Sequence, residues 1–161
     1  MKTVGFSTAG SLKMEFLVCT VPCHDECEQQ DCPNQKKEVK LLETVTFHLP
    51  EQQVLSVDAG FVFDGASIPR ICWTSVGHPL EHRFIYAALL HDALYSSQLL
   101  PRETADQYFQ TYLKEFAGVG FFTAWKMYTG VRLFGGGAWK DKTDEQIASA
   151  RTLVHLHEVN E

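Results

Sequence analysis

An apolar run from Phe84 to Leu94 contains a histidine and an aspartate side by side, His91 and Asp92. Apart from the hydroxyl of Tyr86, every other side chain in the run is apolar. A segment that is apolar around its whole circumference is typical of a helix buried on most sides. Buried titratable groups are costly unless partners compensate them. The fold must therefore supply partners for both side chains, and the resulting cluster is either a structural lock or a reaction centre.

The N-terminal part of the chain favours strands. Runs rich in Val, Thr, Phe and Leu show partial alternation, which predicts β-strands. These runs are Leu12–Cys19, Val39–Leu49 and Val54–Phe63. Between the first two runs, the polar, cysteine-rich residues 19–37 predict an insertion at the tip of a long hairpin.

From about Pro79 the spacing of apolar residues becomes helical. A helix over Leu80–Ser97 is followed by a second that begins near Pro101 and stops at Gly118. Further helices are expected over residues 120–133, mostly buried, and 144–159, opened by a capping box from Thr143 to Gln146. We predict one α+β domain over residues 1–161, with an N-terminal antiparallel sheet (1–63) and three to four packed helices (79–161).

Charge and hydropathy exclude some classes of function. The formal net charge is −6 and no cluster of Lys and Arg is present, which argues against a sequence-independent nucleic-acid binder. No stretch is apolar enough to predict a membrane span, and the N terminus does not resemble a secretory signal. We expect a protein made in a bacterial host cytoplasm, unless it leaves inside a larger particle.

The helix pair predicts a specific contact. Two helices joined by a short loop pack as antiparallel neighbours, and the turn centre lies near residue 99. Asp106 and His91 are then at similar distances from the turn, and Tyr95 lies on the same face as His91. A histidine held by a carboxylate through one ring nitrogen can accept a proton from water through the other. A lock between the two helices explains the same residues without chemistry.

Asp92 points about 100° away from His91 around the helix. It could hold a cation, or it could cap a backbone group or pair with an arginine such as Arg70 or Arg102. Asp64 precedes Gly65, which permits positive φ. Asp64 could therefore complete a cation site with Asp92, or simply satisfy the amides of its own turn.

Four cysteines in the polar loop are the second candidate site. Cys19, Cys23, Cys27 and Cys32 lie within fourteen residues, with His24 among them as a possible replacement ligand. Four thiolates in a loop too small for a core can bind a structural Zn²⁺ ion and fold the loop. Disulfides or free thiols are the alternatives.

Other residues have simpler interpretations. His155 and His157 are expected on different faces of the last helix, in solvent. Trp125 and the phenylalanines are expected in the core or an interface, with a lipid-facing patch as the minor alternative. The glycines at 135–137 follow a helix and are not expected to precede one, so they do not fit a phosphate-binding loop.

Several ordered motifs between about Val57 and Trp139 resemble a family of phage and prophage proteins catalogued as domain of unknown function 1353. The motifs are Asp64-Gly65-Ala66-Ser67-Ile68-Pro69-Arg70, His91-Asp92-Ala93-Leu94-Tyr95, Arg102 with Ala105-Asp106, and Val131-Arg132-Leu133-Phe134-Gly135. The resemblance implies a phage-encoded protein and supplies no reaction.

A weaker resemblance suggests a reaction. His91-Asp92-x-x-Tyr95 followed by Asp106 is similar to the helix-pair active site of secreted phospholipases A2. It implies that His91 activates water, that Asp92 binds Ca²⁺, that Tyr95 supports the network and that Asp106 orients the histidine. The chain lacks that family's flanking disulfides and glycine-rich calcium loop.

Two functions are therefore expected. One is a virion- or tail-associated phage protein with a phospholipase-like His/Asp hydrolase centre. The other is a non-catalytic structural or adaptor component that contacts other virion or tail proteins, with the Cys loop as a zinc-stabilised interaction tip. The sequence does not decide between these functions, and it gives no oligomeric state.

Overall fold

A computed structural model describes residues 5–7, 13–17, 38–65 and 84–158 of the chain. The described strands form two antiparallel sheets, with the strand orders β1-β4-β5-β7 and β2-β3-β6. The strands are β1 (Gly5–Ser7), β2 (Met14–Leu17), β3 (Glu38–Leu41), β4 (Val45–His48), β5 (Gln53–Val57), β6 (Val62–Phe63) and β7 (Val154–Glu158).

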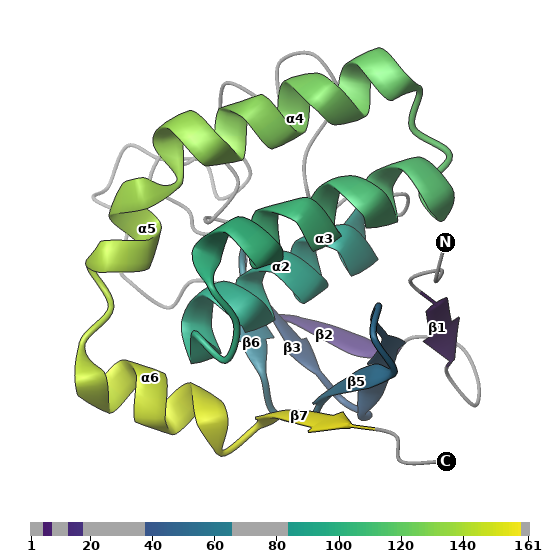
Figure 1. Ribbon diagram of the computed structural model, residues 1–161. Coiled ribbons are helices and arrows are strands. Elements are labelled where there is room, and N and C mark those ends of the chain that lie inside the picture. Colours follow the sequence, from purple (N-terminus) through teal and green to yellow (C-terminus); the bar gives the residue numbers. More distant parts are fainter. Residues whose placement is uncertain (1–4, 8–12, 18–37, 66–83, 159–161) are drawn as a thin grey trace, which may run out of the picture.

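The helices cover the sheets from one side (Figure 1). They are α2 (Ile85–Ser97), α3 (Arg102–Glu115), α4 (Phe121–Phe134), α5 (Gly136–Lys140) and α6 (Asp144–Arg151). Helix α2 packs against β6 and α3, and α4 packs against α3. Helix α4 therefore lies on the outer side of the helical layer, away from the strands (Figure 1).

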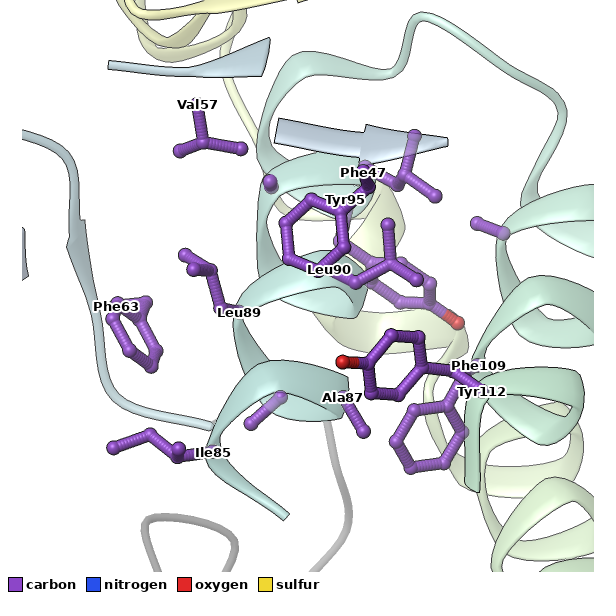
Figure 2. Close-up of a cluster of buried hydrophobic side chains, with 14 of the residues drawn as sticks. Phe47, Val57, Phe63, Ile85, Ala87, Leu89, Leu90, Tyr95, Phe109 and Tyr112 are labelled. Carbon is purple, nitrogen blue, oxygen red and sulfur yellow. The ribbon is translucent and has the colours of Figure 1, made fainter. Parts of the chain in front are cut away.

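Helix α2 lies at the centre of the hydrophobic core. All of its residues except Tyr86 and Ser96 are buried, which confirms the prediction of a helix covered on most sides. Strand residues such as Phe47 and Val57 lie on one side of it, and Phe109 and Tyr112 of α3 lie on another (Figure 2). The apolar circumference of α2 is thus the reason that its polar pair is held away from water.

The predicted α+β class is confirmed, but the strands divide between two sheets. The run Val39–Leu49 forms β3 and β4, and the run Val54–Phe63 forms β5 and β6; in each case the two strands belong to different sheets. In the second run the chain turns at Gly60, whose φ of +97° strongly favours glycine. The cysteine-rich hairpin predicted for residues 19–37 lies outside the described residues.

The last predicted helix is wrong beyond Arg151. The capping box is present, since Thr143 and Gln146 bond each other's backbone N–H groups. Residues 154–158, however, form β7, which pairs with β5 along the edge of the larger sheet. Alternation of inward Val154 and Leu156 with polar residues is a strand pattern, and the sheet edge supplies the hydrogen-bond partners that favour it.

Three smaller expectations also change. His155 and His157 share one face of β7, with ring centroids 6.2 Å apart, and His155 Nε2 lies 3.2 Å from Asp58 Oδ2. The glycine run does precede a helix, because Gly136 begins α5. Helix α4 is not mostly buried, since only four of its residues are: Ala124, Met127, Gly130 and Val131.

Candidate functional site: a buried His–Asp–Arg cluster

The predicted contact between the imidazole and the acid is present. Helices α2 and α3 are joined by a short link, so they pack as neighbours and bring His91 opposite Asp106. His91 Nε2 lies 2.8 Å from Asp106 Oδ1, and both side chains are 0% exposed. The rings of Tyr95 and Phe109 pack on the imidazole, at centroid distances of 4.1 and 4.8 Å. The orientation of His91 is therefore set by packing as well as by the hydrogen bond.

Asp106 is the centre of the cluster. The hydroxyl of Tyr95, which the spacing placed on the same face as His91, donates to Asp106 Oδ1 at 2.7 Å. Arg132 Nη1 of α4 donates to Asp106 Oδ2 at 2.9 Å, and Arg102 Nε lies 3.7 Å from the same oxygen. One carboxylate thus binds side chains from three helices.

Arg132 was not predicted as a member of the cluster, and Arg102 was predicted only as a possible partner of Asp92. Arg102 Nη2 donates to the carbonyl oxygens of Val131 and Arg132 at 2.8 and 2.6 Å, at the C-terminal end of α4. Arg102 Nε also donates to the Tyr95 hydroxyl at 3.2 Å. A guanidinium with several donors in a plane suits this bridging of backbone and side chains. The available signal was the pairing of Arg102 with Asp106 at i and i+4, together with the Val131–Gly135 motif.

The electrostatics of the cluster favour an ionised Asp106. Burial alone would raise the pKa of this carboxyl group, but hydrogen bonds from His91, Tyr95 and Arg132 outweigh it and lower the pKa below its ordinary value of 3.8. Burial and the hydrogen bond to Asp106 raise the pKa of Tyr95, which keeps its hydroxyl a donor. Because an ionised carboxylate can only accept, His91 Nε2 is the donor in its hydrogen bond to Asp106.

A pocket of about 400 Å³ lies beside the cluster. Both acids of the predicted cation site, Asp64 and Asp92, line it, together with Tyr95, but His91 and Asp106 do not. Gly65 has φ of +70°, and its N–H donates to Asp92 Oδ2 at 2.7 Å. The sequence indicated that Gly65 permits positive φ, and of the alternatives for Asp92 the structure shows a bond to a backbone N–H group.

The metal predictions are not decided by these contacts. Within residues 38–65 and 84–158 and the two short N-terminal strands, no three His, Cys, Asp or Glu side chains are grouped to hold a metal. A cation at Asp64 and Asp92 stays a prediction. The four cysteines predicted to bind zinc, with His24, lie outside the described residues, as do Arg70 and residues 66–69.

The backbone at Gly135 packs closely against the hydroxyl of Tyr95. A Cβ atom at Gly135 would lie 2.5 Å from the Val131 carbonyl oxygen and 2.9 Å from the Tyr95 hydroxyl. We expect Gly135→Ala to lower the free energy of unfolding by about 1–3 kcal/mol, because neither neighbour can move without disturbing the cluster.

Gly137→Ala is the matched control for this prediction. A Cβ atom there would meet only Asp141 Oδ2 at 3.6 Å, an ordinary contact. Alanine inside α5 should raise stability by about 0.5–1 kcal/mol. Urea denaturation of both variants measures the difference; equal stabilities would show that Gly135 has room for a side chain.

The fold and the site define an α+β protein with a buried His–Asp–Arg cluster that joins three helices. Residues 39–131, more than half of the chain, match the family described as "Protein of unknown function (DUF1353)", and the chain belongs to that family. Neither the curated proteins nor the solved structures contain a match. No helix in the described part of the chain is long and apolar enough to cross a bilayer.

Proposed function

We propose that this protein is a non-catalytic structural or adaptor component of a phage particle, in which the cluster around Asp106 holds three helices together. The observation that carries the proposal is the sealing of the cluster. His91 and Asp106 are both 0% exposed, and Asp106 accepts hydrogen bonds from His91, Tyr95 and Arg132. Such a network fixes helix packing when all of its members are satisfied.

The position of the pocket also supports a lock. A general base must come within hydrogen-bond distance of the proton that it removes, directly or through one water molecule. The pocket is lined by Tyr95 and Asp92 but not by His91. In addition, every buried side-chain nitrogen and oxygen among the described residues has a hydrogen-bond partner. The geometry therefore accounts for the polar core without a reaction.

The phage assignment is supported by the resemblance described above to a family of phage and prophage proteins. In this proposal the protein is made in the host cytoplasm and incorporated into the virion, where other virion or tail proteins are its partners. The loop of residues 19–37 would contact a neighbour, with a structural Zn²⁺ ion held by its cysteines.

A second candidate function is a phospholipase-like hydrolase. It is favoured by the arrangement of His91, Asp106 and Tyr95, which provides an oriented imidazole one residue away from a carboxylate that lines a pocket. Asp92 with Asp64 would bind Ca²⁺, and His91 would act as the general base. This function requires that the pocket extend to His91 when substrate binds.

Two substitutions of His91 separate these functions. Gln places a nitrogen donor close to the position of Nε2 but has no basic ring nitrogen, whereas Ala removes both. For the lock, we expect His91→Ala to cost about 2 kcal/mol of folding free energy, as for loss of a hydrogen bond to a charged group, and His91→Gln to recover much of it. Urea denaturation measures both values.

The same proteins are assayed for hydrolysis of phospholipid and soluble ester substrates with added calcium. The lock predicts no hydrolysis by the parent protein. Hydrolysis by the parent that disappears in a stably folded His91→Gln variant would instead establish the hydrolase. The adaptor role further requires that the protein co-purify with assembled phage particles, and its absence from them would contradict that role.

A further inference from the structure

Helix α4 exposes large apolar side chains on its outer side. We define the α4 aromatic face as four residues that are between 47% and 70% exposed and lie within about 120° of one another around the helix: Phe121, Phe122, Trp125 and Leu133. The opposite side of the helix packs on the protein through small or buried residues that include Ala124, Gly130 and Val131. A helix on the surface of a soluble protein normally turns polar residues outward. Clustered exposed apolar residues of this kind mark an interaction surface.

Two lysines lie beside this face. Lys114 Nζ lies 5.9 Å from the ring centroid of Phe121, and Lys126 Nζ lies 5.4 Å from that of Phe122. No Asp or Glu occurs in the 14 residues of α4, although the whole chain has a formal net charge of −6. Among the described residues, α4 thus carries most of the exposed aromatic rings, and it has no acidic residue.

We propose that the α4 aromatic face binds an anionic lipid surface. A helix of 14 residues is about 21 Å long, so α4 can lie flat on a membrane with its exposed rings at the level of the headgroups. Lys114 and Lys126 would then contact anionic headgroups while their aliphatic stems lie along the aromatic rings.

Charge disfavours a second copy of the chain as the occupant. A second copy would present the same two lysines to this face, whereas an anionic lipid surface would offer them negative charge. A lipid surface satisfies both features of the face at once, because it accepts aromatic rings and offers negative charge. Helix α4 lies on the outer side of the helical layer (Figure 1), and the side chains of the face are 47–70% exposed.

Flotation of the full chain with lipid vesicles tests this proposal. The vesicles contain either equal parts of phosphatidylglycerol and phosphatidylcholine, or phosphatidylcholine alone. We expect binding to the anionic vesicles that weakens with salt, and much less binding to the neutral ones. Replacement of both Phe122 and Trp125 by Ser should weaken binding by about tenfold or more, because two large side chains lose their burial.

Matched variants control for general effects of polarity and charge. The double variant Leu42→Ser and Val62→Ser also removes two exposed apolar side chains, but on the strand side of the molecule, and should bind normally. Lys126→Gln should weaken binding about fivefold, whereas Lys140→Gln in α5 should have a smaller effect.

Several results would overturn the proposal. They are no binding to anionic vesicles, equal binding to neutral vesicles, or binding that the Phe122/Trp125 substitutions leave unchanged. Analytical ultracentrifugation in the absence of lipid tests whether a second copy of the chain occupies the face instead. If the parent chain is a dimer and the Phe122/Trp125 variant is a monomer, the face is an interface between copies of this chain and not a lipid-binding surface.

Discussion

Asp106→Asn should lower the free energy of unfolding by about 3 kcal/mol, a large share of the roughly 5–15 kcal/mol that stabilises a typical domain. The substitution removes the negative charge from a position that is 0% exposed, close to Arg132 and Arg102. The asparagine amide would also place an NH₂ group against a donor. If the nitrogen replaces Oδ1, it faces the His91 and Tyr95 donors, and if it replaces Oδ2, it faces Arg132. Loss of one partner from a buried ion pair commonly costs about 3–5 kcal/mol. The arginines are partly exposed, which places the expected value at the lower end.

The pH dependence gives a second readout of the same carboxylate. Because the pKa of Asp106 is lowered in the folded protein, its ionised form contributes stability that is fully present above the ordinary value of 3.8 and is lost as the pH falls through the folded value. The stability difference between the parent and Asp106→Asn should therefore be constant from neutral pH to about pH 5 and shrink below about pH 4. Urea denaturation across this range measures it.

Glu115→Gln is a suitable control, because it makes the same chemical change at an exposed position on the same helix. It should change stability by less than about 0.5 kcal/mol. Two results would contradict the role of Asp106 as the charged centre of the helix packing. They are a stability change for Asp106→Asn as small as that for Glu115→Gln, or a stability difference from the parent that stays the same below about pH 4.

The packing of α2 on α3 could be predicted from the sequence because the apolar pattern and the short connecting link determine it. The apolar circumference of residues 84–94 required burial, and the short link after Ser97 required antiparallel packing, so the contact between His91 and Asp106 followed from spacing alone. Arg132 was missed because it lies 26 residues from Asp106, on a helix whose crossing angle no spacing rule supplies. The predicted catalytic role requires knowledge of solvent access, which spacing does not provide.

The strands illustrate a different limit. The pattern of residues 154–156 is compatible with a surface helix as well as with a strand. The strand forms because the tertiary structure places β5 beside this segment as a hydrogen-bonding partner. Similarly, the aromatic residues of α4 resemble core residues in the sequence. Their exposure depends on which side of α4 packs on α3, and the helix is apolar on both sides.

Phe109→Ala should cost about 3–5 kcal/mol of folding free energy, the largest effect that we expect from one substitution. The ring is 0% exposed and packs on the imidazole of His91, so its removal leaves a cavity and takes away the support that orients the histidine. The matched control is Phe121→Ala, which removes the same atoms from a position that is 70% exposed and should change stability by less than about 0.5 kcal/mol. Thermal and urea denaturation measure both. A cost below about 1 kcal/mol for Phe109→Ala would mean that the neighbouring side chains refill the space, and that the packing of α2 on α3 does not depend on this ring.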